Sequence, residues 1–598
     1  MTDSPISTSL SDPLYYLSNV HFIMDWVLTR YADCLHDEEL AQLNTFQHLP
    51  EATQALWVRL VMRKGLHFRQ EKLNYPEIGD ITAAVEPLLK AQWVTINAEV
   101  TWPELYRLLT KAEWQACFET QGAALGLTRR DSKQQWYQTL TPDYADQQSI
   151  WTQWWPEAPA PLLSLLQQDL FERLKLMFFG NLHQDWSEFI LVELGYQTHE
   201  KVNFTAEDRA FEDRATLDHY WQLHQWREAL EQPATSPSRL LQACLEQYPS
   251  PINNPWLEER RSRLLWHMGL AADRQRDEAT ALLAWSHSQY REARLRQLRL
   301  MERQGAYQEA WSLLVEALQS PRNPAEKLGL ERIEKRLSQK LKQPIISAKN
   351  ATSRPQIPTK TLQLPPTTSV EQAVAAVLGS ESHPVYYTEN HLFNGLFGLL
   401  FWDIIFAPLP GAFFHPFQER PADLYRADFV QRRQSAIHQR LELLDTPSPL
   451  ATHSPSQPRP DAWQQMIRDH WQAKQGITNP FVYWPLWRSS ALLDWALECI
   501  DAQTLQVIFR DLLSDLRLHR RGMPDLVQFS AQGELSHPVT GAPCHYQLIE
   551  VKGPTDRLQD HQTRWIERAL TAGLPVSVVH VQWLASNHPI AAQSEIAS

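Results

Sequence analysis

Two acidic residues and a lysine near the C-terminal end of the chain have the types and spacing of a metal-binding site. Asp525 precedes one strand-like run, and Glu550 and Lys552 end a second. Residues two apart on a strand project to the same side, so Glu550 and Lys552 are expected together. A hairpin turning near Gly533 and Gly541 would bring Asp525 beside them. Carboxylate oxygens suit a hard divalent cation, and the same face could hold or activate a water.

The elements that must position these residues form an α/β unit. Strand-like runs occur at 526–529, 546–551 and 575–583, and a helix is expected at 556–572 between the last two. The Val-rich last run is typical of a buried strand. Upstream, residues 389–406 and parts of 485–518 have helical patterns.

A structural interpretation competes with the metal site. Asp525 could cap a turn, and Glu550 and Lys552 could form an ion pair on an edge strand. That interpretation explains an isolated Glu-x-Lys well. The ordered series Pro-Asp, then Glu-Val-Lys-Gly-Pro, then Asp-Arg-Leu-x-x-x-Gln favours a functional motif instead.

These residues carry a family resemblance. Pro524-Asp525 followed by Glu550-Val551-Lys552 matches the PD-(D/E)xK nuclease motif, and GMPDL with IEVKGPTDRLQDHQ resembles its VRR-NUC branch. TENHLFNGLFGLLFWDIIF (388–406) resembles the helix that carries an additional catalytic Glu in the Fanconi-associated nuclease family. KLNYPEI (72–78) resembles a stretch near that family's SAP-type DNA-binding element.

The resemblance implies a set of ligands and catalytic residues. The implied ligands of Mg²⁺ or Mn²⁺ are Asp525, Glu550, the backbone carbonyl of Val551, and Glu389 directly or through water. Lys552 would position or deprotonate the attacking water and stabilise the charge that develops on phosphorus. Gln562 would orient Lys552 or the scissile phosphate.

The resemblance also implies DNA contacts. Arg517 and Arg520 match positions that grip DNA phosphates, and His561 stands where some relatives have Lys. Histidine is mostly neutral near pH 7, which weakens the case for a phosphate contact there. The implied partner is branched or flapped double-stranded DNA.

A mostly helical, multidomain chain is expected. Low Gly (19) with abundant straight-chain residues favours helix, and the 40 Pro should lie mainly at helix ends and in linkers. The expected parts are an N-terminal helical region (1–70), a SAP-like element (71–126), a helical connector (127–235), tetratricopeptide-like helix pairs (236–342), a linker (343–372) and a restriction-endonuclease-like nuclease domain (373–598).

Composition excludes several classes of protein. The net charge of −13 over 598 residues argues against a uniformly basic coat, but not against local basic tracks. The five Cys lack zinc-finger spacing. The N-terminus lacks the features of a signal peptide, and the apolar stretch 392–414 is interrupted by Asp403 and two prolines. We therefore expect a buried core helix there, no membrane partner and a cytoplasmic location.

The function that the resemblance implies is structure-selective DNA cleavage near 5′ flaps or ends, with 5′-to-3′ trimming and a role in interstrand crosslink repair. One alternative with related chemistry is a Holliday-junction resolvase or a restriction-type defence nuclease. An alternative from another class is a non-catalytic scaffold whose helix pairs bind protein partners.

Two features stay open at this level. Asp403 is either a buried, satisfied structural carboxylate or a partner of the metal-site residues. Residues 258–303 hold ten Arg against seven acidic residues, which indicates either a solvated face with local ion pairs or a phosphate-binding track.

Overall fold

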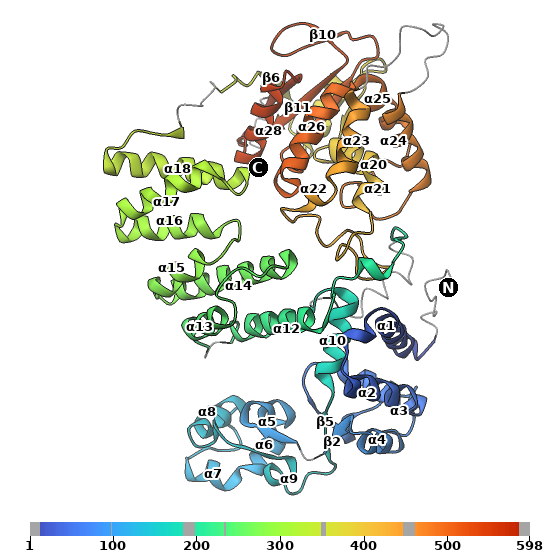
Figure 1. Cartoon of the computed structure of the whole chain (residues 1–598), viewed down its shortest axis with the longest axis vertical. Coiled ribbons are helices and arrows are strands. Elements are labelled where there is room, and N and C mark those ends of the chain that lie inside the picture. Colours follow the sequence, from blue (N-terminus) through green and yellow to red (C-terminus); the bar gives the residue numbers. More distant parts are fainter. Residues whose placement is uncertain are drawn as a thin grey trace, which may run out of the picture. The chain divides into compact units, whose positions relative to one another are not determined.

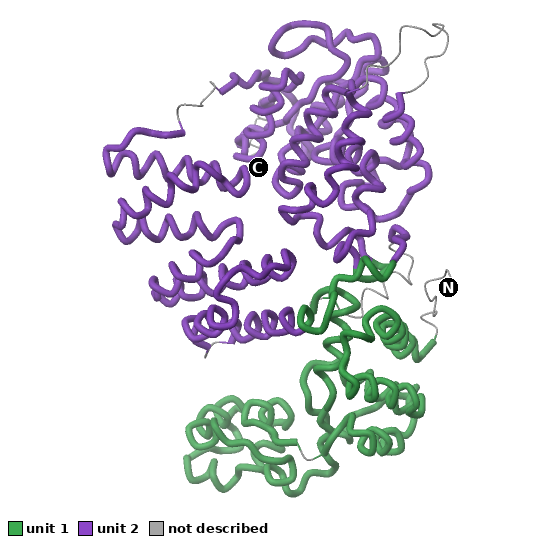
Figure 2. Tube along the Cα trace, viewed as in Figure 1, with its two compact units in different colours: residues 1–197, 205–217, 414–417 green, residues 198–204, 218–413, 418–598 purple. Residues whose placement is uncertain are grey.

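The computed structural model describes residues 12–96, 98–182, 184, 198–232, 235–347, 354–445 and 461–584. The chain forms two compact units (Figure 2). Unit 1 comprises residues 1–197, 205–217 and 414–417, and unit 2 comprises residues 198–204, 218–413 and 418–598. Each unit is described by itself.

The described part of unit 1 consists of helices and two small sheets (Figure 1). Its helices are α1 (Tyr15–Tyr31), α2 (Asp37–Gln47), α3 (Glu51–Val61), α4 (Ile81–Lys90), α5 (Trp102–Leu108), α6 (Lys111–Cys117), α7 (Glu119–Ala124), α8 (Lys133–Tyr144), α9 (Trp151–Trp154) and α10 (Gln168–Phe179). Its strands are β1 (His67–Arg69), β2 (Val94–Thr95), β3 (Glu99–Thr101), β4 (Gln148–Ile150) and β5 (Leu162–Leu165).

The described part of the helical connector expected at 127–235 contains two strands, β4 and β5. Strand β5 pairs antiparallel with both β1 and β2, and β4 pairs antiparallel with β3. The connector thus shares sheets with both regions that precede it. The short run LLSL of β5 carries no strand signal of its own, because periodicity does not separate so short an apolar run from part of a buried helix.

Unit 2 begins with helices that pack in chain order (Figure 1), as expected for helix pairs. Neighbours α14 to α18 each contact the next helix, and α18 also contacts α16. These helices are α12 (Arg214–Ala229, which begins in unit 1), α13 (Pro237–Gln247), α14 (Pro255–Arg274), α15 (Glu278–Ser286), α16 (Ala293–Gln304), α17 (Tyr307–Gln319) and α18 (Pro324–Leu341).

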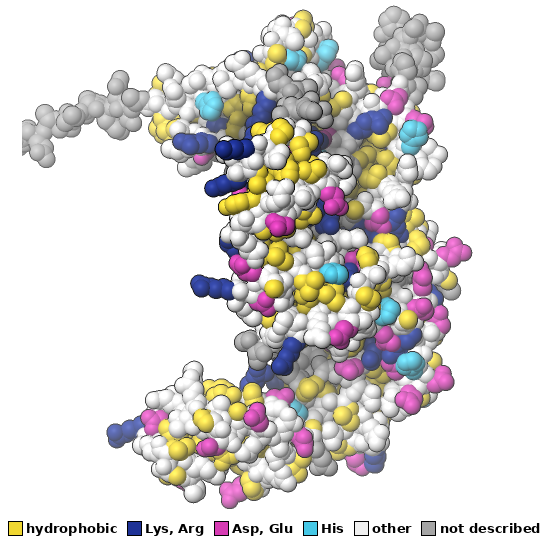
Figure 3. All heavy atoms as spheres, turned by 60° about the vertical axis from the view of Figure 1, so that its left-hand side comes forward, with side chains coloured by type: hydrophobic (Ala, Val, Ile, Leu, Met, Phe, Trp, Pro, Cys, Tyr) yellow, Lys and Arg dark blue, Asp and Glu magenta, His cyan; other side chains and the backbone are white. Residues whose placement is uncertain are grey.

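Ion pairs engage part of the Arg-rich stretch 258–303. Arg294 pairs with Glu326 of α18 at 2.8 Å, and Arg303 pairs with Asp273 and Glu278 of the preceding helices. Figure 3 shows acidic and basic side chains on the same face of the molecule. The interpretation as a solvated, ion-paired face therefore accounts for these two arginines.

A five-stranded mixed sheet is the centre of the nuclease domain. Its order is β6-β12-β11-β8-β7, with parallel pairing of β12 to β6 and to β11, and antiparallel pairing elsewhere. The strands are β6 (Thr359–Leu364), β7 (Val385–Tyr387), β8 (Leu526–Phe529), β11 (Tyr546–Lys552) and β12 (Val576–Trp583). The three strands expected from the sequence are confirmed, and helix α28 (Asp560–Thr571) connects β11 to β12.

The remaining helices pack beside this sheet (Figure 1). They are α19 (Val370–Leu378), α20 (His391–Leu400), α21 (Trp402–Ile405), α22 (Phe429–Arg432), α23 (Gln434–Asp445), α24 (Ala462–Ala473), α25 (Ala491–Cys499), α26 (Ala502–Ser514) and α27 (Leu516–His519). Residues 392–400 of α20 are all buried, which confirms the expected core helix. No helix in the described part of the chain is long and apolar enough to span a membrane.

The linker expected at 343–372 is partly a strand. Residues 359–364 form β6 and pair in register with β12, from Thr359 opposite Val578 to Leu364 opposite Trp583. Strand β6 lies at the sheet edge, where prolines on both sides of a strand are tolerated. Its Pro-rich flanks concealed the strand, so the nuclease domain begins earlier than residue 373. Residues 348–353 of this range lie outside the described residues.

Candidate active site

The sheet register brings Asp525 beside the end of β11. Strands β8 and β11 are antiparallel with Leu526 opposite Ile549, so Asp525 comes next to Glu550. The backbone N–H of Val551 donates to Oδ2 of Asp525 at 2.9 Å. The hairpin expected between these strands is present, and its long excursion folds into strands β9 (Leu535–Ser536) and β10 (Pro543–Cys544).

Glu550 is fully buried and only partly satisfied. Its Oε1 accepts from Lys552 Nζ at 2.8 Å and from Gln562 Nε2 at 2.6 Å. Its Oε2 is buried and has no hydrogen-bond partner among the residues that the structure describes. An unsatisfied buried carboxylate oxygen is costly, and a hard cation with oxygen ligands would satisfy it. The donor set therefore fits a divalent metal ion.

The backbone of Glu389 is hydrogen-bonded to that of Asp525. The N–H groups of Thr388 and Glu389 donate to the carbonyl oxygen of Asp525 at 2.8 and 2.9 Å. Glu389 lies between β7 and α20 with φ of +43°, a region that side-chain-bearing residues rarely adopt. The helix expected from residue 389 begins at His391, so Glu389 is a turn residue rather than a helical one.

The Glu389 carboxylate has its own partners. Oε2 accepts from the hydroxyl of Tyr387 at 3.0 Å, and Oε1 accepts from Asn390 Nδ2 at 3.3 Å. No three acidic, His or Cys side chains among the described residues form a ready-made metal cage. Asp525 and Glu550 would thus supply two carboxylates, with backbone carbonyl and water completing the shell, as is common for Mg²⁺.

Burial and neighbouring charge shift the protonation of the acidic pair. Burial raises the pKa of both Asp525 and Glu550 above the ordinary carboxyl range. The charge of Glu389 raises both pKa values further, whereas that of Lys552 lowers them. A metal-free site therefore favours bound protons, and a cation would compete with them.

Lys552 and Gln562 converge on one oxygen of Glu550. The Lys552 side chain is 10% exposed and projects with Glu550 from one sheet face, as the i, i+2 spacing predicts. Gln562 accepts from the N–H of Gln559 at 3.0 Å and thereby caps α28. Because Gln562 Nε2 also donates to Glu550, its side chain is held against Glu550. The sequence instead predicts that Gln562 orients Lys552 or the phosphate.

The three expected DNA-binding residues have different surroundings. Arg517 is exposed, and Arg520 is half-buried with its guanidinium donating to the hydroxyl of Tyr425. His561 lies in the first turn of α28, and a Cβ added at Gly522 would lie 2.6 Å from the His561 carbonyl oxygen. Burial lowers the pKa of His561, and the charges of Arg564 and Lys552 lower it further. His561 therefore stays neutral near pH 7.

Asp403 was expected to be a buried structural carboxylate or a partner of the metal-site residues, and within the described residues it is neither. Its side chain is 57% exposed and pairs with Arg440 Nη2 at 2.8 Å. Trp402, Ile404 and Ile405 are the buried residues of α21, so the helix turns Asp403 outward. It is a surface ion-pair residue.

Sequence reasoning missed Asn390. Its Oδ1 accepts from the N–H of Met523 at 3.1 Å while its Nδ2 donates to Glu389. Asn390 therefore ties the segment before Asp525 to the turn that carries Glu389. The only signal in the sequence is its position directly after Glu389.

Comparisons with known proteins agree with this geometry. The family model described as "VRR-NUC domain" matches residues 459–583, and that described as "FAN1, HTH domain" matches residues 14–95. The second match crosses the boundary expected between the N-terminal region and the SAP-like element at residue 71. A VRR-NUC domain with this acidic pair and lysine defines a nuclease that depends on a divalent metal.

The similarity extends over nearly the whole chain. The chain is 40% identical over 580 residues to a Fanconi-associated nuclease 1 homolog of Pseudomonas aeruginosa, covering 96% of this chain and 97% of that protein. The chain belongs to the Fanconi-associated nuclease family. The human Fanconi-associated nuclease 1 is 31% identical over 194 residues, which are 32% of this chain and 17% of the human protein.

Solved structures match in the same way. The crystal structure of paFAN1 bound to DNA with a 2-nucleotide 5′ flap and a gap superposes with a TM-score of 0.80 at 39% identity. That match covers 97% of this chain and 100% of the other. A second paFAN1 structure, bound to a 1-nucleotide 5′ flap with a gap, has a TM-score of 0.79.

Proposed function

We propose that this chain is a structure-selective nuclease that cuts DNA near 5′ flaps, trims strands from 5′ to 3′ and acts in the repair of interstrand crosslinks. The observation that carries the proposal is the near-complete match to a relative crystallised on 5′-flap DNA. The buried acidic pair beside Lys552 supplies the chemistry. We further propose that the enzyme works in the cytoplasm on DNA with Mg²⁺ or Mn²⁺.

The positions of the residues support the following roles. Asp525, Glu550 and the Val551 carbonyl would hold the cation, and Glu389 would reach it directly or through water. A divalent cation in such a site acts as a Lewis acid and lowers the pKa of bound water. Lys552, next to Glu550, would position the attacking water and stabilise the charge that develops on phosphorus.

The other two groups of residues would position the reactants. Gln562 holds the buried oxygen of Glu550 that Lys552 also contacts, and so keeps the carboxylate oriented. Arg517 and Arg520 would bind backbone phosphates, which fixes the register of the DNA without reading its sequence. His561, being neutral, would contribute at most a hydrogen bond.

A panel of end-labelled DNAs tests the proposal. Flapped, nicked, forked and four-way substrates are digested by the wild type and by Asp525→Ala, with Mg²⁺, Mn²⁺ or EDTA. We expect metal-dependent cutting near the 5′ flap by the wild type and none by the variant. Preferred, symmetric cutting of the four-way junction would favour a resolvase, and no metal-dependent cutting of any DNA would favour a scaffold.

A further inference from the structure

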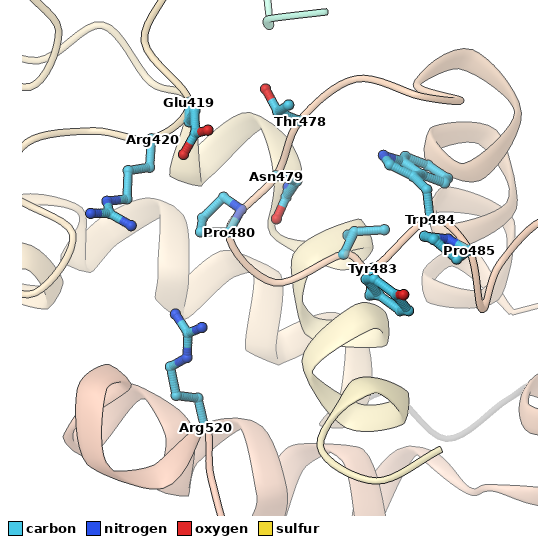
Figure 4. Close-up of a pocket in the computed structure, with 10 residues that line it drawn as sticks. Glu419, Arg420, Thr478, Asn479, Pro480, Tyr483, Trp484, Pro485 and Arg520 are labelled. Atoms are coloured by element: carbon cyan, nitrogen blue, oxygen red, sulfur yellow. The ribbon is translucent and has the colours of Figure 1, made fainter. Parts of the chain in front are cut away.

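A pocket of about 310 Å³ lies in unit 2. Arg420 and Arg520 line it from two different segments, and Figure 4 shows their side chains extending toward one another. Tyr483 and Asn479 line it from the segment before α25. Glu419 is an acidic residue in the same lining.

Two sets of contacts connect this pocket to the acidic cluster. The ring of Tyr483 stacks on His391 with centroids 4.5 Å apart, and His391 is two residues from Glu389. The carbonyl of Arg520 accepts from Asn394 Nδ2 at 2.8 Å, and Asn394 also donates to the carbonyl of Asn390 at 2.6 Å. The pocket is therefore held next to the turn that carries Glu389.

Three guanidinium groups lie near the ring of Tyr425, and two of them, those of Arg420 and Arg520, also line the pocket. Arg420, Arg517 and Arg520 lie 5.5, 5.3 and 5.7 Å from its centroid. Within the described residues, none of the three forms an ion pair with a carboxylate. Like charges gathered in this way repel one another, and guanidinium groups bind phosphate oxygens with charge-assisted hydrogen bonds. The cluster therefore suits an anion.

The loop that carries Tyr425 is fixed in place. Asp423 is fully buried, and its carboxylate accepts from Arg433 at 2.8 and 3.1 Å and from Arg432. Arg433 also donates to the carbonyl of Ile404 at 3.1 Å. Because buried ion pairs with several hydrogen bonds hold one geometry, the arginines around Tyr425 are organised before any ligand arrives.

Tyr483 offers an aromatic surface beside this cluster. The residue is 50% exposed although its ring stacks on His391. Aromatic side chains next to a positively charged groove bind unpaired bases by stacking, with little dependence on sequence. A base in a duplex cannot reach such a ring, because its faces are covered by its neighbours.

We propose that this pocket binds one unpaired nucleotide of the DNA next to the scissile phosphate. Its phosphate lies among Arg420, Arg517 and Arg520, and its base stacks on Tyr483. This inference rests on the proposed function and adds to it a determinant of flap selection. Arg420 and Tyr425 lie outside residues 459–583, the range that the VRR-NUC family model matches, whereas Tyr483 lies within it.

Equilibrium binding of the full chain tests the inference. Affinities are measured with Ca²⁺, on DNA checked to be intact, for a 5′-flap duplex, the same duplex with abasic flap nucleotides, and a fully paired duplex. We expect Tyr483→Ala to weaken binding to the flap about tenfold and binding to the other two DNAs less than about twofold. Tyr483→Phe keeps the ring and should retain the flap preference.

The phosphate contact has its own measurement. Arg420→Gln should lower the slope of log affinity against log salt on the flap by about one. Val539→Ala, at another exposed hydrophobic residue, serves as the matched control and should change neither quantity. An equal loss by Tyr483→Ala on all three DNAs, no loss on the flap, or an unchanged salt slope for Arg420→Gln overturns the inference.

Failure of the inference can be told apart from failure of the proposed function. If Asp525→Ala still cuts flaps, the active-site assignment is wrong while the binding results for Tyr483 and Arg420 stand. If Asp525→Ala is inactive and Tyr483→Ala binds all DNAs normally, the pocket assignment alone is wrong.

Discussion

The backbone N–H of Glu389 donates to the carbonyl oxygen of Asp525 at 2.9 Å, which binds two segments 136 positions apart in the sequence into one site. The bond fixes the turn before α20 against the start of β8. It explains why Glu389 keeps a left-handed backbone conformation, since the neighbouring strands over-determine its geometry. Glu389 is thereby available to the acidic pair without being part of the helix.

Removal of the Lys552 ammonium should abolish chemistry but not binding. Lys552→Ala deletes the only lysine that contacts Glu550 in the described residues, so we expect flap cleavage to slow by about 10²- to 10³-fold. Affinity for flap DNA should change little. Single-turnover cleavage and fluorescence anisotropy on the same DNA separate the two effects. Cleavage at the wild-type rate would exclude Lys552 from the mechanism.

Charge reversal at α27 should act on DNA binding. Arg517→Glu combined with Arg520→Glu removes two expected phosphate contacts, so binding should weaken and its salt slope should fall by about two. Affinity is measured over a series of salt concentrations. Val539→Ala leaves the charge of the protein unchanged and is the control. Arg440→Glu is not suitable, because Arg440 pairs with Asp403. A salt slope equal to that of the wild type would contradict the phosphate role.

Much of this site could be predicted from the sequence because it lies on regular strands. The alternating projection of β11 placed Glu550 and Lys552 together, and the antiparallel register brought Asp525 alongside. The position of Glu389 could be expected only from family resemblance, and its turn geometry could not, because a single strained residue leaves no periodic signal.

Long-range contacts account for what the sequence did not show. Strand β6 depends on pairing with β12, more than 200 residues later, and its Pro-rich flanks indicate a linker. Arg420 and Tyr425 lie in an irregular loop whose fixed position depends on the buried Asp423. The positions of β6 and of this loop depend on tertiary contacts, which local sequence propensity does not encode.

The buried acidic pair should make the metal-free protein sensitive to pH. Because burial raises the folded-state pKa of Asp525, its stabilising contribution is complete at low pH and is lost as pH rises through that pKa. Asp525→Asn should therefore stabilise the metal-free protein near pH 8 by on the order of 1–3 kcal/mol and have no effect near pH 3. Thermal unfolding in EDTA measures this. A variant less stable than the wild type at high pH would contradict it.

Loss of the Asp423 carboxylate should destabilise the nuclease domain. Asp423→Ala leaves Arg433 buried without its ionic partner, which costs about 3–5 kcal/mol. Asp403→Ala removes an exposed partner of Arg440 and should cost less than about 1 kcal/mol, so it is the matched control. Chemical denaturation of both variants tests the difference. Equal effects would mean that the Asp423 pair does not hold the Tyr425 loop.

Calorimetric titration of Mn²⁺ into the wild type and Asp525→Ala, without DNA, tests most directly whether these side chains form a cation site. The wild type should bind Mn²⁺ and release protons, because the cation displaces them from carboxylates with raised pKa values. Asp525→Ala should lose that binding. Equal Mn²⁺ binding and proton release by both proteins would contradict the site.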